Sequence, residues 1–197
     1  VGQVPVHYNE YSTGRPHVEG KDKDRFRSKY LDIPNEPLYP FGYGLSYTEF
    51  EQKMGELEEK DGQISVDVEV TNTGDVAGKD VVEVYYKPPY TNGGIEKSSA
   101  NLIEFAKTDL LQPGESQTVT VTFSIEDMAS YDENNAKAYV LEKGDYVISI
   151  NSDSHTVLDQ KTYTADADVV YKGENKRASD DTAATNVFED AKGDVTY

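Results

Sequence analysis

The sequence predicts a mostly β protein, an antiparallel sandwich preceded by an extended N-terminal segment and followed by a polar C-terminal tail. Two observations lead to this fold class. Apolar and polar residues alternate in several short runs, and Pro, Gly and Asn signals separate one run from the next. Strands joined by short turns favour an antiparallel sandwich over βαβ units.

The first clear strand is QISVDVEV, beginning at residue 63. Its apolar residues share one face of the strand and its polar residues the other, as expected for a half-buried strand. The turn sequence NTGDVAGKD follows, and then DVVEVYYK, a second strand that Pro88 and Pro89 stop. Residues 90–99 read as a long loop. The apolar set of the first strand is Ile64, Val66, Val68 and Val70.

The second half of the sandwich begins after a turn at residues 112–115. There SQTVTVTFSI alternates again and predicts another strand. Residues 125–137 are mostly polar and read as a loop with one helical turn. Two strand-like runs then flank residues 143–145, and VLDQKTYTA gives one more. The tail from residue 173 is too polar to fold on its own.

The region before the sandwich differs in character. GQVPVHY could be a buried strand, but residues 8–37 show no sustained period. The run LYPFGYGLSYTEF, residues 38–50, then packs many aromatic side chains between Pro40, Gly42 and Gly44. Pro removes a backbone donor and glycine costs backbone entropy, so this run does not predict an autonomous helix or strand. We expect it to lie against a folded surface.

Composition excludes several classes of function. The chain has 197 residues and 36% hydrophobic residues, which predicts one domain with long extensions. Its formal charge of -18 repels phosphate backbones and anionic lipid, so neither nucleic acid nor a membrane is an expected partner.

The chain contains no cysteine, which rules out a disulfide framework and a thiolate nucleophile. The compartment stays open on this evidence, with the cytoplasm slightly favoured. No apolar run is long enough to span a bilayer, and the first residues do not form a signal peptide. The missing initiator Met suggests a piece of a longer chain.

No catalytic, metal or cofactor site is predicted from the residues. Carboxylates are abundant, with 37 Asp and Glu, but nearly all fall in turns or on polar strand faces. The three histidines show no metal-binding spacing, and the G-x-S-x-G and phosphate-loop motifs are absent. The DENN sequence at 132–135 lacks the glycine and terminal glutamate of a calcium loop.

Cations alternate through EGKDKDRFRSKY, which is best explained as a solvated loop. Two loop cations, Arg15 and Lys29, are candidates for contacting a polar substrate or a dimer interface, because a loop cation can hydrogen-bond sugar hydroxyls. The general preference of Lys and Arg for solvent favours the plainer interpretation for both.

Three segments together resemble the C-terminal part of glycoside hydrolase family 3 enzymes, chiefly bacterial β-glucosidases. They are GQVPVHYNEYSTGRP, then KYLDIPNEPLYPFGYGLSYTEFE, and then the sandwich with LLQPGESQTVTVTFSIEDMASYD. PLYPFGYGLSYT is the most specific of these signals. One departure is Glu104, which precedes Phe105 where relatives commonly have Gly, in a run that is one residue longer.

The resemblance implies a division into four parts. Residues 1–37 would end the family's α/β sandwich domain, and 38–50 would connect it to an immunoglobulin/fibronectin type III-like domain at 51–155. Residues 156–197 would be a final strand and a linker toward a barrel domain, as in a branch with permuted domain order. Residues from 175 onward would then dock on that absent partner.

The resemblance also carries expectations about function. The family's catalytic Asp and Glu lie in parts not matched here, so no catalytic residue is carried over and this segment alone should be inactive. Its partners would be the remaining domains and, through them, a β-glucoside or oligosaccharide, and a homodimer stays open. The residues expected to pack between the domains are Tyr39, Phe41, Tyr43, Leu45 and Tyr47.

Two alternatives compete with this scaffold interpretation. A carbohydrate-binding or adhesion module could stack sugar rings on exposed tyrosines, with Tyr86, Tyr90 and Tyr131 as candidates. A free-standing hydrolase using carboxylates would need a cleft, which one small sandwich rarely provides.

Overall fold

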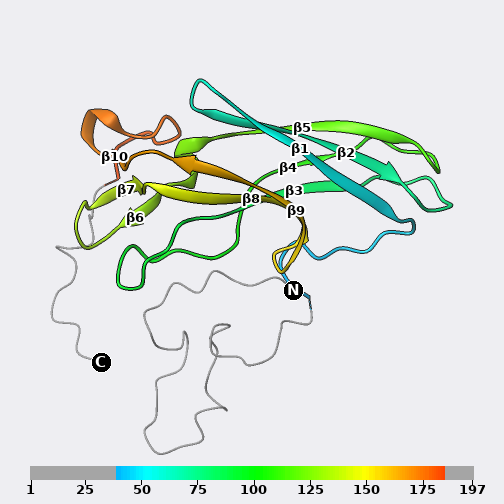
Figure 1. Ribbon diagram of the computed structural model, residues 1–197, viewed down its shortest axis with the longest axis horizontal. Coiled ribbons are helices and arrows are strands. Elements are labelled where there is room, and N and C mark those ends of the chain that lie inside the picture. The colour runs from blue at the N-terminus through cyan, green and yellow to red at the C-terminus, as the bar shows by residue number, and fades with distance from the viewer. Residues whose placement is uncertain (1–38, 185–197) are drawn as a thin grey trace, which may run out of the picture.

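The computed structural model describes residues 39–184 and shows an all-β fold in that range (Figure 1). The strands are β1 (Phe50–Lys60), β2 (Gln63–Asn72), β3 (Val81–Lys87), β4 (Asn101–Lys107), β5 (Ser116–Ser124), β6 (Ser130–Asp132), β7 (Ala138–Leu141), β8 (Gly144–Asp153), β9 (Thr156–Ala165) and β10 (Val169–Tyr171). Two short 3-10 turns are η3 (Ile125–Met128) and η4 (Gly173–Asn175). In this range no helix is long and apolar enough to cross a membrane.

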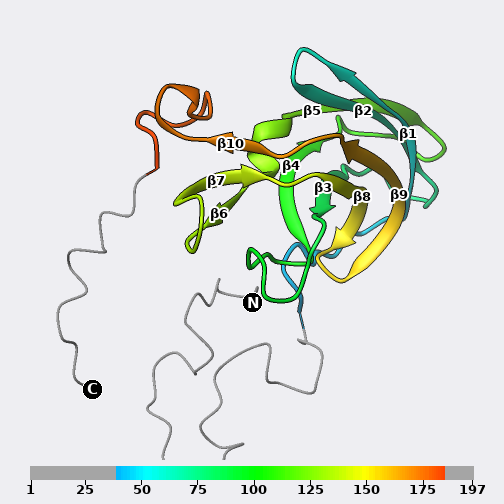
Figure 2. The same cartoon turned by 60° about the vertical axis from the view of Figure 1, so that its left-hand side comes forward.

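The strands form two principal sheets that face each other across the core (Figure 2). One has three strands in the order β1-β2-β5, and the other has four in the order β4-β3-β8-β9. All pairings are antiparallel. A small third sheet, β10-β7-β6, extends one end of the sandwich. The predicted antiparallel sandwich is therefore confirmed.

The alternation in the sequence translates directly into burial. In β2 the four apolar residues named above are each at most 1% exposed, and the residues between them face outward or are half-buried. β5 pairs with β2 along its whole length and alternates in the same way. Removal of these side chains from water supplies the main stabilisation of the sandwich.

Strand β1 was not among the expected strands. Its sequence, FEQKMGELEEK, is mostly polar, and only Met54 of the strand is fully buried. A register shift between Met54 and Leu57 breaks the alternation, because a bulge puts two residues opposite one. β1 places only one fully buried side chain in the core, so its period-two signal is weak.

The pairing of β3 with β4 contains one irregularity. The register between β3 and β4 pairs Val84 with Glu104 and Tyr85 with Leu102, so Ile103 has no partner across the ladder. This irregularity absorbs one residue without changing the order of strands.

The later elements agree with the sequence except at the tail. The loop with one helical turn corresponds to η3, and the last three predicted runs to β7, β8 and β9. β10 was not anticipated. Residues from 175 were expected to dock on an absent partner, and two of them, Arg177 and Ala178, contact the sandwich itself. The Arg177 guanidinium lies 3.6 Å from the centre of the Tyr139 ring, and Ala178 N donates to Glu126 Oε1 at 2.8 Å.

Two opposite ends of the sandwich are used below. The connector pole is the end where β1 begins, with the loops at residues 73–80 and 108–115 and the turn between β8 and β9. The far pole is the end with the β1–β2 turn, η3 and the third sheet. The described chain enters at the connector pole (Figure 1).

Candidate interdomain surface

The connector, residues 39–49, makes a sharp turn directly after it enters the described structure. Tyr43 N donates to Pro40 O at 3.1 Å, which closes a four-residue turn. Gly42, its third residue, has a φ of 85°. That position of a type II turn requires a positive φ, which explains the glycine, while Pro40 restricts the backbone before the bend.

The turn is held against the four-stranded sheet by what we call the latch, made by Glu83, Tyr85 and Ser154. Tyr85 OH donates to Glu83 Oε2 at 2.8 Å, and Gly42 lies directly on this pair. A Cβ on Gly42 would lie 2.7 Å from Tyr85 OH and closer still to Glu83 Oε2. Ser154 N, in the β8–β9 turn, donates to Phe41 O at 2.8 Å.

The latch is electrostatically distinctive. Burial raises the pKa of Glu83, and the nearby carboxylates of Asp153 and Asp80 raise this pKa further, against the opposing effect of the hydrogen bond from Tyr85. Burial and the neighbouring Glu83 likewise raise the pKa of the Tyr85 hydroxyl, which remains a donor. The Tyr85 hydroxyl therefore stays protonated at neutral pH and can donate to Glu83.

A second anchor holds the end of the connector. Thr48 Oγ1 donates to Asn72 Oδ1 at 2.9 Å, and the amides of Thr73 and Gly74 donate to Glu49 O at 2.8 and 3.2 Å. Asn72 is fully buried, at 0% exposure. The connector is thus fixed to the sandwich at both of its ends.

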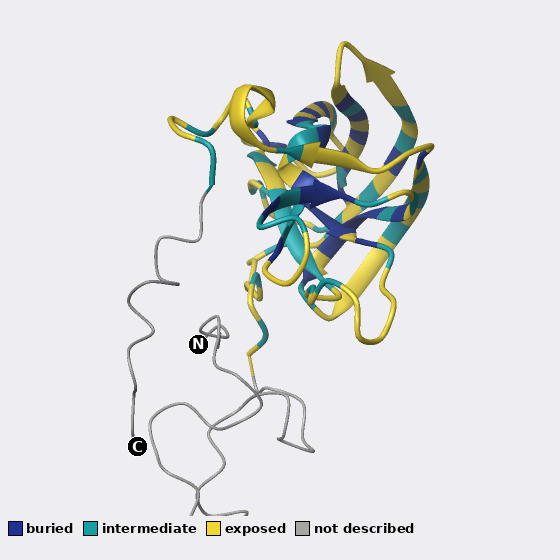
Figure 3. Cartoon of the chain, turned by 90° about the vertical axis from the view of Figure 1, so that its left-hand side faces the viewer, coloured by how far each residue is buried: buried dark blue, intermediate teal, exposed yellow. Residues whose placement is uncertain are grey.

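Backbone contacts make the attachment, and the aromatic side chains stay outside. The exposed fractions are 49% for Tyr39, 42% for Phe41, 43% for Tyr43, 88% for Leu45 and 100% for Tyr47. Figure 3 shows the connector as a mainly exposed segment beneath the sandwich. Tyr39 and Tyr43 contact each other with ring centres 5.3 Å apart. Packing of these side chains between two domains stays a prediction.

Other apolar side chains are exposed at the same end. Nine of the thirteen large apolar side chains exposed within residues 39–184 belong to the connector pole. Besides the five in the connector they are Val76, Leu110, Val157 and Leu158. Concentrated apolar exposure of this kind marks a surface that contacts another macromolecule.

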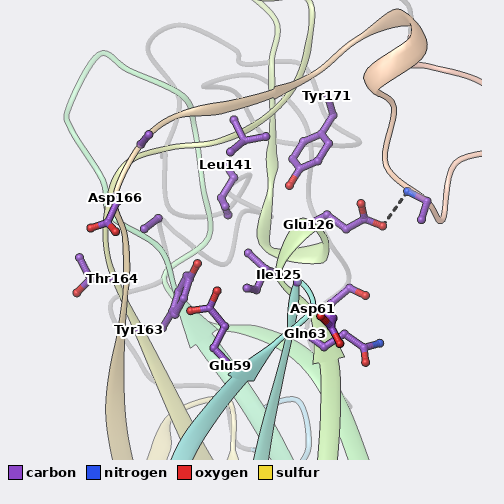
Figure 4. Close-up of a pocket in the computed structure, with 16 residues that line it drawn as sticks. Glu59, Asp61, Gln63, Ile125, Glu126, Leu141, Tyr163, Thr164, Asp166 and Tyr171 are labelled. Atoms are coloured by element: carbon purple, nitrogen blue, oxygen red, sulfur yellow. Dashed lines mark hydrogen bonds between the residues drawn. The ribbon is translucent and has the colours of Figure 1, made fainter.

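The far pole holds a cavity of about 530 Å³, shown in Figure 4. Ile125 and Leu141 line it together with Tyr163, and carboxylates such as Asp61 and Asp166 stand at its rim. Neither Lys, Arg nor His lines it, and the described residues contain no group of three or more potential metal ligands. This cavity supplies no recognisable catalytic set.

The three tyrosines proposed for sugar stacking differ in how far they are exposed. Tyr86 is 9% exposed and belongs to the core, so a stacking role for it is wrong. Tyr131 is half-buried and forms an edge-to-face pair with Tyr139, with ring centres 5.6 Å apart. Tyr90 is 52% exposed and its hydroxyl donates to Glu96 at 3.2 Å. Arg15 and Lys29 lie outside the described residues.

Sequence reasoning missed the latch. Glu83 and Tyr85 stand two apart on β3 and were assigned only to a strand, although their outward direction follows from the alternation with buried Val82, Val84 and Tyr86. The signal that could have found them is a glycine in a turn, which indicates close approach of another group.

Comparison with known proteins agrees with this architecture. A family model described as fibronectin type III-like domain matches residues 80–154. Residues 80–154 are thus similar to a fibronectin type III-like domain. The match covers β3 to β8, which hold the latch residues Glu83 and Tyr85.

The curated relatives that this chain matches are glycosidases longer than the chain itself. It is 37% identical to a periplasmic β-glucosidase of Salmonella typhimurium over 161 residues, 80% of this chain and 20% of that one. It is 35% identical to a β-xylosidase of Formosa agariphila, over 78% of this chain and 20% of the relative. The chain thus spans about a fifth of these curated relatives.

Solved structures show the same relationship. The β-glucosidase 3B of Thermotoga neapolitana, solved with α-D-glucose, matches with a TM-score of 0.63 and 36% identity, over 70% of this chain and 19% of that one. The β-glucosidase of Listeria innocua, solved with glucose, matches with a TM-score of 0.60 and 36% identity, over 83% and 22%. The fibronectin type III-like chain therefore corresponds to a noncatalytic region of family 3 β-glucosidases.

Proposed function

We propose that the chain is a structural module of a β-glucosidase-type glycoside hydrolase, and that the longer parent chain hydrolyses O-glycosyl bonds in carbohydrate metabolism. The observation that carries this proposal is the match to a noncatalytic region of β-glucosidases, of which the chain covers about a fifth. Relatives named β-xylosidase leave the sugar preference of the parent open.

The role of the module in that enzyme is mechanical. Its connector side chains, Tyr39, Phe41, Tyr43, Leu45 and Tyr47, pack against the domain that precedes it. Full burial of one large apolar side chain contributes about 1.5 to 3 kcal/mol. Several such side chains are enough to fix one domain relative to the next.

The finer divisions follow from the same proposal. Residues 1–37 end an α/β sandwich domain, 38–50 form the connector, 51–155 the fibronectin type III-like domain, and 156–197 its final strand with a linker. The remaining domains of the parent are the partners of the module. Arg15 and Lys29 are proposed to approach the sugar cleft or a homodimer interface, and a β-glucoside or oligosaccharide reaches them only in the parent.

The first test is an assay of the purified 197-residue chain with an aryl β-glucoside. No turnover is expected, because the chain holds none of the family's catalytic motifs. Turnover that persists through further purification would overturn the proposal. Calorimetric titration with cello- and xylo-oligosaccharides separates the scaffold from a carbohydrate-binding module, since a scaffold gives no heat of binding.

A further inference from the structure

We propose that the latch holds the connector pole as a preformed docking surface for the segment that precedes it, residues 1–38 of this chain. The inference rests on the proposed structural role and identifies its occupant and its positioning residues. Nothing in the comparisons assigns a role to Gly42, Glu83, Tyr85 or Ser154.

The first step is that the latch removes freedom from the connector. The turn at Pro40–Tyr43 is closed by its own hydrogen bond, and Ser154 N holds the carbonyl of Phe41. Gly42 lies so close to Glu83 and Tyr85 that a side chain at position 42 would displace them. The backbone on either side of Gly42 therefore has one preferred course.

The second step is that this course fixes the directions of side chains. Tyr39 and Tyr43 flank the turn and touch each other, and each remains nearly half exposed. The β8–β9 turn, which supplies Ser154, leads into Val157 and Leu158, which are 52% and 46% exposed. The latch thus ties the connector to the turn that leads into this second group of exposed apolar side chains.

The third step concerns the occupant. The chain that leads into Tyr39 arrives at this pole, so residues 1–38 are tethered to the surface at high effective concentration. These residues contain six Lys or Arg and six Asp or Glu, and so carry no net charge. A second copy would instead bring a net charge of -18 against another -18. Charge therefore favours the preceding segment over self-association.

The latch matters because a preformed surface binds with less loss of entropy. Ordering a flexible, rotamer-rich side chain on binding costs about 0.5 to 1.5 kcal/mol. A connector already held by backbone bonds avoids much of this cost. We therefore expect the affinity of the pole for residues 1–38 to depend on Gly42.

A photo-cross-linking experiment on the 197-residue chain tests the proposal. A benzophenone amino acid replaces Leu158 at the connector pole, and the products are mapped by mass spectrometry. Intramolecular cross-links to residues 1–38 are expected. The matched control puts the same group at Val170 on β10, where exposure is 42% against 46% for Leu158. The control should give no cross-links to residues 1–38.

Two glycine variants isolate the latch. Gly42→Ala introduces a Cβ against Glu83 and Tyr85 at a positive φ, and should lower the cross-link yield from position 158 at least fivefold. Gly44→Ala, two residues away, meets no atom within 4 Å and should leave the yield unchanged. Both positions lie outside the strands, so the sandwich should fold in both variants, as amide exchange in β2 and β8 would verify.

The possible results separate cleanly. Cross-links to a second copy, cross-links to no protein segment, or an equal yield from both glycine variants would each overturn the docking proposal. None of these results bears on glycosidase turnover. Turnover by the isolated chain, in contrast, would overturn the proposed function without affecting the cross-linking pattern.

Discussion

At the scale of single residues, Asn72 joins more of the connector pole than any sequence pattern suggests. Its Nδ2 donates to Val76 O at 2.8 Å and to Leu111 O at 2.9 Å. Its Oδ1 accepts from Thr48 Oγ1 and from Gly74 N, at 2.9 and 3.1 Å. One buried amide thus ties the connector to the loops on both sides of it.

Asn72→Ala should lower the free energy of unfolding by about 2 to 4 kcal/mol, because several buried polar groups lose their partner at once. Urea denaturation of the 197-residue chain measures this loss. Asn92→Ala, at an exposed loop position, provides the control and should change stability by less than about 0.5 kcal/mol. Equal effects of the two substitutions would show that the Asn72 contacts are not important for stability.

Glu83 should give the latch a dependence on pH. Burial raises its pKa above 4.5 in the folded chain, so the folded state binds this proton more tightly than the unfolded state does. The resulting stabilisation is fully present below pH 4.5 and is lost as the pH rises through the raised pKa. The wild-type chain should therefore gain stability relative to Glu83→Gln as the pH falls from neutral toward 4.5.

Unfolding free energies of both chains at several pH values check this sign. Gln keeps an acceptor for Tyr85 OH but does not titrate, so it isolates the carboxyl group. A difference between the two chains that stays constant from pH 7 to about pH 4.5 would show that Glu83 is not perturbed by its surroundings.

At the scale of elements, the segment after β9 behaves as a strap. β10 pairs with β7, and beyond it the Arg177 guanidinium binds both carboxylate oxygens of Asp180, at 2.9 and 2.7 Å, while it covers Tyr139. A fork-shaped guanidinium can make these contacts together, and an ammonium cannot. Arg177 therefore holds a polar segment that has little apolar surface of its own.

Arg177→Lys should loosen the strap although the charge is kept. Amide exchange in residues 169–180 should become at least threefold faster, corresponding to a loss of about 0.7 kcal/mol, in the range of one cation–π contact. Exchange in β2 should be unchanged, since the sandwich core does not include Arg177. Unchanged exchange throughout the strap would mean that the pairing of β10 alone holds it.

The elements that the sequence predicts well are those with one buried and one wet face. β2 and β5 each have one face on the core and one face in solvent. Apolar and polar residues therefore alternate along both strands. β1 buries only Met54 and contains a register shift, and β10 has only three residues, so neither gives a period-two signal.

The candidate site shows the same division. The aromatic density of the connector is a local property, so its role as a contact segment can be anticipated from 13 consecutive residues. The latch depends on Gly42 meeting Glu83, Tyr85 and Ser154 from distant parts of the chain. Such meetings depend on the register of β3 and β8, which the composition of a single strand does not determine.

At the scale of the whole molecule, the two ends of the sandwich differ in their exposed apolar side chains. Exposed apolar side chains gather at the connector pole, whereas the far pole has a carboxylate-rimmed cavity and the strap. Exposed apolar side chains gathered at one end are expected where a module packs against a preceding domain. This polarity is the physical basis of the proposed structural role.

Hydroxyl-radical footprinting most directly tests the claim that the connector pole is an interdomain surface. The oxidation rates of Tyr39, Phe41, Tyr43, Val157 and Leu158 would be compared between the longer parent enzyme and the same enzyme denatured in urea, with Val170 as the exposed reference. The account predicts strong protection of the five pole residues in the native parent and little protection of Val170. If the pole residues were as little protected in the native enzyme as Val170, the account would be contradicted.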